Sequence, residues 1–131
     1  MILGIGTDII NIGRISRLLL HYQERFVKKI LSTKEIKIFG EIDNSLKPRY
    51  LAKRFAAKEA FTKALGLGIG RPIGFNDIEV LNDSAGKPFL NLLNYQSIIK
   101  DYIIHISLSD DSEYGVAFVV ISLYKVDKSS Y

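Results

Sequence analysis

Cysteine is absent from the 131-residue chain, and only two histidines are present. The chain therefore forms no disulfide bond and no thiolate metal site, and histidine-rich zinc ligation is excluded. No apolar run approaches the roughly 20 residues that a membrane-spanning helix needs. The first residues lack a basic leader and a small-residue cleavage site, so we expect no secretory signal. Together these features predict a cytoplasmic protein that does not enter a membrane.

Hydrophobic residues make up 47% of the chain, enough to form a core, and 131 residues fit one domain spanning positions 1–131. The net charge is +4, and the pI is about 9.3. This mild excess indicates an acidic partner or a phosphorylated ligand. A nucleic-acid binder is the alternative. Basic and acidic residues are interleaved, however, and no recognition motif or aromatic stacking platform appears, so we expect no nucleic-acid binding.

The first half of the chain has mainly helical patterning. A buried strand is predicted over residues 2–10, and apolar spacing predicts a helix over 12–31. A capping box, Ser32-Thr33-Lys34-Glu35, opens a short helix to about residue 42. Pro48 suits the first turn of a third helix, which ends near residue 65.

The second half is patterned for strands. Runs of β-branched or alternating residues predict strands over 78–81, 88–92, 103–108 and 116–124. We expect a hairpin turn over residues 82–87, a short helix or a loop over 94–102, and a frayed tail over 125–131. Helices followed by strands predict an α+β fold, in which the N-terminal strand and helices pack on a mostly antiparallel sheet.

Two isolated carboxylates stand where the pattern expects apolar residues. Asp8 ends Gly4-Ile5-Gly6-Thr7-Asp8, and Glu59 lies in the third helix near Arg54, Lys58 and Lys63. Burying a carboxylate is costly unless positive charge offsets it. A pair of carboxylates among cations indicates Mg²⁺ and an anionic phosphate ligand. Two simpler interpretations stay open: Asp8 caps the next helix, and Glu59 forms an ordinary exposed pair with Lys63.

Two weaker signals lie later in the chain. His105, Ser107 and Ser109 alternate and so share one face of a strand, which is either a phosphate or adenine contact or a solvated face. The glycine-rich residues 66–71 allow a ligand to approach the backbone, or they simply end the helix. They do not form a Walker A loop.

Several short sequence blocks, in their order and spacing, resemble those of the bacterial holo-acyl-carrier-protein synthases, which are short 4′-phosphopantetheinyl transferases. The matching blocks cover nearly the whole chain, and they are Gly4-Ile5-Gly6-Thr7-Asp8-Ile9, Arg54-Phe55-Ala56-Ala57-Lys58-Glu59-Ala60, Lys63-Ala64-Leu65-Gly66, Gly68-Ile69-Gly70-Arg71, Asn76-Asp77-Ile78-Glu79-Val80, Gly86-Lys87-Pro88 and His105-Ile106-Ser107-Leu108-Ser109.

The resemblance implies transfer of the 4′-phosphopantetheine group from coenzyme A to a serine of apo-acyl carrier protein, in support of fatty acid biosynthesis. By motif position, Asp8 and Glu59 look like Mg²⁺ ligands, and Lys63 looks like a catalytic residue that also reaches the phosphates. The residues that look like further coenzyme A contacts are Arg54, Gly70, Arg71, Lys87 and His105. The resemblance also implies a homotrimer, in which each site lies at a junction between subunits. Larger broad-range transferases look like two fused copies, for which 131 residues have no room.

Acyl carrier proteins are acidic, which agrees with the basic first helix. The resemblance implies that the carrier contacts this helix through Arg14, Arg17, Arg25 and Phe26. Charge would steer the encounter, and apolar contacts would hold the carrier.

Two positions depart from the family pattern. The family usually has histidine where this chain has Asp110, so the group that takes the serine proton is open among Glu59, Asp110, Asp111 and a metal-bound water. Lys53 replaces a small residue and adds charge near the expected phosphate site.

Overall fold

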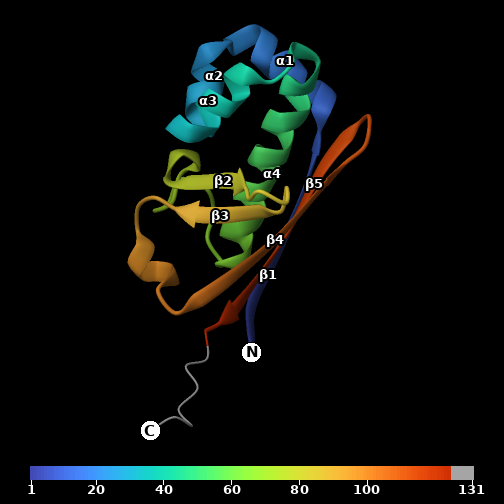
Figure 1. Cartoon of the computed structure of the whole chain (residues 1–131). Coiled ribbons are helices and arrows are strands. Elements are labelled where there is room, and N and C mark those ends of the chain that lie inside the picture. The colour runs from blue at the N-terminus through green and yellow to red at the C-terminus, as the bar shows by residue number, and fades with distance from the viewer. Residues whose placement is uncertain (125–131) are drawn as a thin grey trace, which may run out of the picture.

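A computed structural model describes residues 1–124, so the frayed tail predicted for residues 125–131 lies outside the described residues (Figure 1). The elements in chain order are β1 (Ile2–Asn11), α1 (Ile12–Tyr22), α2 (Glu24–Ile30), α3 (Thr33–Glu41), the 3₁₀ turn η1 (Asn44–Leu46), α4 (Lys47–Ala64), η2 (Phe75–Asp77), β2 (Ile78–Asn82), β3 (Pro88–Leu92), η3 (Gln96–Ile99), β4 (Tyr102–Asp110) and β5 (Tyr114–Leu123).

The strands form two antiparallel sheets. In the larger one, β5 lies between β1 and β4, and in the smaller one β2 pairs only with β3. Figure 1 shows α4 lying along one face of the larger sheet, with α1, α2 and α3 gathered near its first residues and the β2–β3 hairpin beside it. The predicted α+β fold is confirmed, and the strands predicted for one sheet are divided between two.

The helix predicted over residues 12–31 is wrong as a single element, because it breaks at Gln23. This residue has a positive φ of 50°, and its N–H donates to the carbonyl oxygen of Leu19 at 2.8 Å, which ends α1. The chain then turns, and α2 buries Val27 and Ile30. No glycine or proline marks the break, and apolar spacing continues through it, so the sequence pattern carried no signal of the turn.

The start of α1 shows that Asp8 is not the residue that caps this helix. The N–H of Arg14 donates to the side-chain oxygen of Asn11 at 2.9 Å, so Asn11 caps α1 and Asp8 does not. The capping box predicted for Ser32 and Glu35 is confirmed at the start of α3.

Glycines in β1 allow α4 to lie unusually close to that strand. A Cβ atom built on Gly6 would overlap the carbonyl oxygen of Ala60, and one built on Gly4 would overlap that of Ala64. The small side chains of α4 and the bare backbone of β1 therefore meet directly. This contact fixes the height of the second half of α4 above the sheet.

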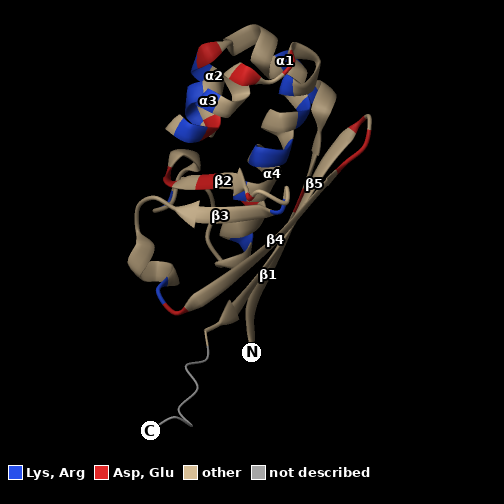
Figure 2. Cartoon of the chain, viewed as in Figure 1, with Lys and Arg blue, Asp and Glu red and all other residues tan. Residues whose placement is uncertain are grey.

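The opposite face of the larger sheet exposes several apolar side chains, and no element among residues 1–124 covers it. Ile5, Ile9 and Phe118 are 62%, 64% and 45% exposed, whereas their neighbours Ala117 and Val119 on β5 are buried against α4. Figure 2 shows Lys and Arg concentrated on the helices, while the sheet strands carry few charges. Every helix within residues 1–124 is too short or too polar to span a bilayer.

The close contact predicts a large effect of one methyl group. Gly6→Ala should lower the free energy of unfolding by about 3 kcal/mol, because backbone atoms of α4 cannot yield as a flexible side chain would. Gly40→Ala is the matched control: Gly40 lies in α3 with open space around its Cβ position. It should raise stability by about 0.5 to 1 kcal/mol. Urea unfolding measures both, and equal stability of Gly6→Ala and wild type would contradict the contact.

Candidate active site

Asp8, Glu59 and Lys63 come together where α4 crosses β1. The ammonium of Lys63 lies 3.0 Å from Oδ1 of Asp8 and donates to the carbonyl oxygen of Thr7, also at 3.0 Å. The side chain of Asp8 is only 16% exposed, whereas that of Lys63 is 51% exposed. Lys63 therefore reaches from solvent over a carboxylate that is set into the surface. Glu59 lies one helical turn before Lys63 on the same side of α4.

The protonation of Glu59 reflects this setting. Partial burial raises the pKa of Glu59, the negative charge of Asp8 raises it further, and Lys63 acts in the opposite direction. The effect of Asp8 shows that the two carboxylates, 51 positions apart (59 − 8), share one electrostatic environment. A divalent cation would relieve their mutual repulsion. Within residues 1–124, no group of three or more metal-ligating side chains is present.

Arg54 lies on the other side of α4. Nine positions separate it from Lys63, which is two and a half helical turns, so the two side chains project in opposite directions. Arg54 is 4% exposed, stacks over the ring of Tyr50 at 4.1 Å, and donates from Nη2 to Oδ1 of Asn82 at 2.7 Å. The structure thus does not bring Arg54 to the Asp8–Glu59 pair.

Arg54 instead supports the hairpin turn that carries Lys87. Asn82, its hydrogen-bond partner, donates from Nδ2 to the carbonyl oxygen of Gly86 at 2.9 Å. The N–H of Lys87 donates to Asp83 within the same turn, and its side chain is exposed. Arg54 and the turn of Lys87, both expected to contact coenzyme A, are therefore linked through Asn82. They do not lie at the Asp8–Glu59 pair.

The remaining predicted contacts lie elsewhere. Gly70 and Arg71 are exposed in the loop after α4, where Gly70 has a φ of 96°. His105 is exposed on β4 and faces the open side of the larger sheet, with Nε2 3.0 Å from Oγ of Ser122. Within one chain, His105 and the carboxylate pair are on opposite faces of that sheet.

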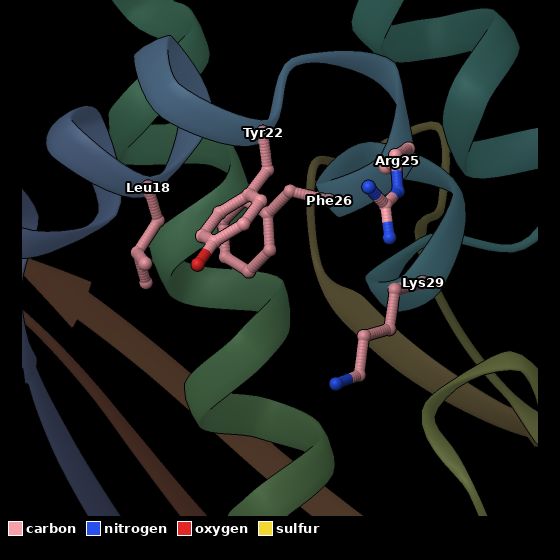
Figure 3. Close-up of a pocket in the computed structure, with 5 residues that line it drawn as sticks. All are labelled: Leu18, Tyr22, Arg25, Phe26 and Lys29. Atoms are coloured by element: carbon pink, nitrogen blue, oxygen red, sulfur yellow. The ribbon is translucent and has the colours of Figure 1, made fainter.

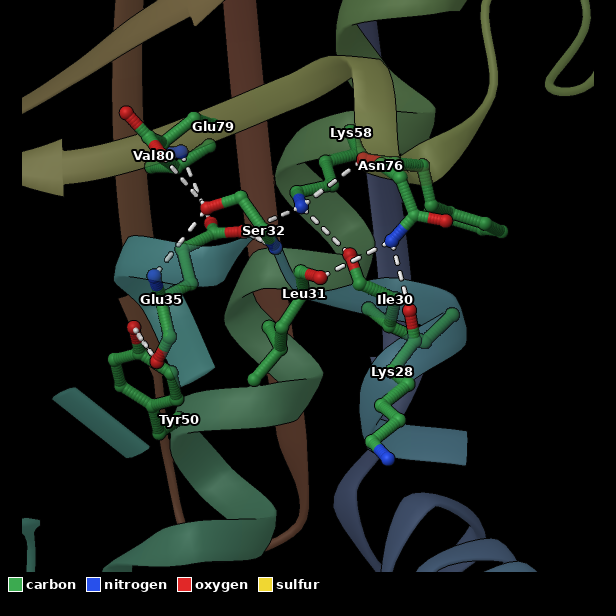
Figure 4. Close-up of polar contacts among 11 residues, drawn as sticks. Lys28, Ile30, Leu31, Ser32, Glu35, Tyr50, Lys58, Asn76, Glu79 and Val80 are labelled. Atoms are coloured by element: carbon green, nitrogen blue, oxygen red, sulfur yellow. Dashed lines mark hydrogen bonds and ion pairs between the residues drawn. The ribbon is translucent and has the colours of Figure 1, made fainter. Parts of the chain in front are cut away.

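The sequence pattern groups Lys58 with the cations expected near a phosphate ligand, and this interpretation is wrong. Its ammonium is fully buried and lies 2.6 Å from Oε1 of Glu35, which is also fully buried (Figure 4). Burial lowers the pKa of Lys58, and Glu35 opposes this. Sequence reasoning identified Glu35 only as a capping residue. Its position three residues after Ser32 predicts the cap, and nothing in that spacing predicts a buried cation beside it.

The two departures from the family pattern contact each other. Asp110 forms two ion pairs: its Oδ1 lies 3.1 Å from Nζ of Lys53, and its Oδ2 lies 3.0 Å from Nε of Arg49. Lys53 therefore serves an ion pair. Asp111 accepts the N–H groups of Tyr114 and Glu113, which lower its pKa, and so caps the β4–β5 turn.

A groove opens between α1 and α2. Its volume is about 430 Å³, and its walls are Leu18, Tyr22, Arg25, Phe26 and Lys29. Figure 3 shows Leu18 and Tyr22 extending from α1 and Phe26, Arg25 and Lys29 from α2, with the rings of Tyr22 and Phe26 overlapping in this view. An apolar floor with a basic edge fits an acidic amphipathic partner. Of the four residues expected to contact a carrier, Arg25 and Phe26 line the groove, while Arg14 and Arg17 are exposed elsewhere on α1.

The raised pKa of Glu59 predicts the direction in which stability changes with pH. The folded protein holds the Glu59 proton more tightly than the unfolded chain, so stability falls as pH rises through the raised pKa. Glu59→Gln should therefore have a higher Tm than wild type at pH 7, with the difference vanishing below the ordinary value of 4.5. Scanning calorimetry across pH measures this. Glu24→Gln, at an exposed α2 position, should leave Tm unchanged, and a lower Tm for Glu59→Gln at pH 7 would contradict the prediction.

Comparison with known proteins places this geometry in one family. A family model described as the 4′-phosphopantetheinyl transferase superfamily matches residues 4–119. A holo-[acyl-carrier-protein] synthase of Wolbachia pipientis subsp. Culex pipiens (strain wPip) is 50% identical over 122 residues, which are 92% of this chain and 98% of that protein.

Two solved structures are similar along nearly their whole length. The holo-(acyl-carrier-protein) synthase of Bacillus anthracis in complex with CoA (3′,5′-ADP) is 41% identical with a TM-score of 0.81, over 92% of this chain and 96% of that chain. The enzyme of Neisseria meningitidis is 37% identical with a TM-score of 0.87, over 93% and 99%. The chain therefore belongs to the 4′-phosphopantetheinyl transferase superfamily.

Proposed function

We propose that this protein transfers the 4′-phosphopantetheine group of coenzyme A to a serine of apo-acyl carrier protein, giving holo-acyl carrier protein and adenosine 3′,5′-bisphosphate. The 50% identical relative is a holo-[acyl-carrier-protein] synthase, and a solved relative holds CoA (3′,5′-ADP). The observation that carries the proposal is the convergence of Asp8, Glu59 and Lys63 at the crossing of α4 and β1. The holo-carrier would serve fatty acid biosynthesis.

We propose Mg²⁺ as the cofactor, held by Asp8 and Glu59. Two carboxylates fit this ion, because Mg²⁺ in phosphate-handling sites takes one or two carboxylates and fills its other positions with phosphate oxygens and water. The bound ion supplies positive charge that offsets the charge developing on the leaving phosphate. Lys63 is placed to hold the same phosphates, since its ammonium already lies over Asp8 and is half exposed.

We propose Glu59 as the group that receives the serine proton. Asp110 has both carboxylate oxygens engaged by Arg49 and Lys53, and Asp111 is engaged by the backbone of its own turn. Glu59 lies at the candidate site itself, close enough to Asp8 and Lys63 for their charges to act on it, so it is near where the serine must react. As the proton moves to the Glu59 carboxylate, the serine oxygen bonds to phosphorus and the bond to the bisphosphate oxygen breaks.

The groove between α1 and α2 is the proposed site for the acyl carrier protein. Arg25 and Lys29 at its edge suit an acidic surface, and Phe26 and Tyr22 offer apolar contact. Exposed Arg14 and Arg17 extend the basic surface along α1. Charge of this kind raises the rate of encounter, while the apolar residues hold the partner.

We propose a homotrimer assembled through the open face of the larger sheet. Ile5, Ile9 and Phe118 expose apolar area that a monomer would leave in water. His105 lies on this same face. A neighbouring copy covering the face would bring His105 toward that copy's site, as expected if coenzyme A binds at a junction. A single domain over residues 1–131 and a cytoplasmic location stay predictions.

Catalysis is tested by mass spectrometry of the carrier. Purified protein with coenzyme A, Mg²⁺ and apo-carrier should add one phosphopantetheine group to the carrier, and chelation of Mg²⁺ should stop the reaction reversibly. Asp8→Ala and Glu59→Ala should each lower kcat by at least about 100-fold while folding normally. No mass gain with a competent carrier over a range of Mg²⁺ would overturn the proposed function. Full activity of both variants would overturn the metal site.

Assembly is tested by light scattering. Wild type should have three times the 14.8 kDa mass of one chain. Phe118→Glu places a charge on the proposed interface and should give monomers with kcat/KM reduced at least about tenfold. Leu46→Glu is the control, since Leu46 is equally exposed but lies in η1, away from the sheet. An active Phe118→Glu monomer would exclude a site shared between copies.

A further inference from the structure

Lys58 joins three separate segments of the chain to α4. Its buried ammonium donates to the carbonyl oxygen of Ile30 at the end of α2, to Oε1 of Glu35 on α3, and to the carbonyl oxygen of Phe75 in η2. The distances are 2.6, 2.6 and 3.1 Å. An ammonium has three N–H donors, so all of them are used. Figure 4 shows these bonds radiating from Lys58 beside the end of α2.

Glu35 extends the junction to the smaller sheet. Its Oε1 also accepts the N–H of Ser32 at 2.8 Å, and its Oε2 accepts the N–H of Val80 on β2 at 2.9 Å. The hydroxyl of Ser32 donates in turn to Glu79 at 2.8 Å. One buried ion pair therefore fixes α2, α3, η2 and β2 against the middle of α4.

The junction connects one wall of the groove to the part of α4 that carries Glu59. Lys29 lines the groove, and the next residue, Ile30, accepts the 2.6 Å bond from Lys58. Lys58 is followed directly by Glu59. Two peptide links and one hydrogen bond thus set the separation of Lys29 from Glu59. Asn76 reinforces this end of α2 by donating to the carbonyl oxygens of Lys28 and Leu31.

An ion pair is a poor choice for stability alone at a fully buried position. Desolvation of both charges offsets much of their attraction, and apolar residues of similar volume often stabilise a core as well or better. Charge-assisted hydrogen bonds are short and directional, however, so they fix the relative positions of the elements that they join. This favours a positioning role.

We infer that Lys58 and Glu35 are positioning residues that set the carrier groove at the correct distance from Glu59. The inference rests on the proposed function. Without the pair, α2 can shift while Asp8, Glu59 and Lys63 stay in place, because Gly4 and Gly6 hold that part of α4 against β1. The acceptor serine would then arrive misplaced at an intact donor site.

The test is a kinetic comparison of Lys58→Met/Glu35→Gln with wild type. The double variant removes both charges together, so neither is left buried alone. Its kcat/KM for apo-carrier should fall about 100-fold, the size of effect expected from an ångström-scale misplacement. Its KM for coenzyme A should change less than about threefold, because a donor site left intact keeps its binding interactions. Wild-type carrier kinetics in the folded variant, or equal losses toward both substrates, would overturn the inference.

Ile104→Ala controls for lost stability. Ile104 packs against the core from β4, which β5 separates from β1 and therefore from Asp8. Assayed well below its Tm, it should show unchanged kinetics toward both substrates even if it is as destabilised as the double variant.

Asn76→Ala is a second, milder variant at the exposed rim of the same junction. It should raise KM for the carrier about threefold to tenfold without affecting coenzyme A, as expected for lost hydrogen bonds. If the double variant does not fold and Asn76→Ala has wild-type carrier kinetics, the inference is overturned. Inactive wild type would instead overturn the proposed function.

Discussion

The direct backbone contact between α4 and β1 is the constraint on which the candidate site depends. Gly4 and Gly6 remove the side chains that would hold the helix away, and Ala60 and Ala64 present carbonyl oxygens in their place. The contact brings Lys63 to 3.0 Å from Asp8. With ordinary side chains at the two glycines, α4 would rise from the sheet and the carboxylates would separate. The glycines therefore act on the site through the geometry of the α4–β1 contact.

Because α4 is packed on nearly every side, it separates its charges by function. Glu59 and Lys63 project toward β1 and solvent, whereas Arg54 and Lys58 project toward the hairpin and α3. Residues at positions i and i+4 share a side, which explains why each pair stays together. Neighbouring residues Lys58 and Glu59 consequently have opposite tasks. One is fully buried and connects elements, while the other is partly open to a ligand.

The sequence was informative where a local pattern has a local cause. The capping box at Ser32 and the pairing of Asp8 with the helix of Glu59 follow from spacing and residue type, and the structure contains both. The buried partner of Lys58 could not be found this way, because Glu35 is 23 positions away and its capping pattern already accounts for it. The break at Gln23 was missed for a similar reason: tertiary burial of Val27 and Ile30 requires a turn that no glycine marks.

The larger sheet separates residues that the sequence places on one ligand. The carboxylate pair lies on the side covered by α4, and His105 lies on the uncovered side, among Ile5, Ile9 and Phe118. No rotation of a side chain carries His105 through a three-stranded sheet. If His105 and a carboxylate pair hold the same coenzyme A molecule, they must therefore belong to different copies. The exposed apolar surface on that same face provides the driving force for such a copy to bind. Assembly and completion of the site would then depend on the same surface. A change that weakens assembly should therefore also leave the site incomplete.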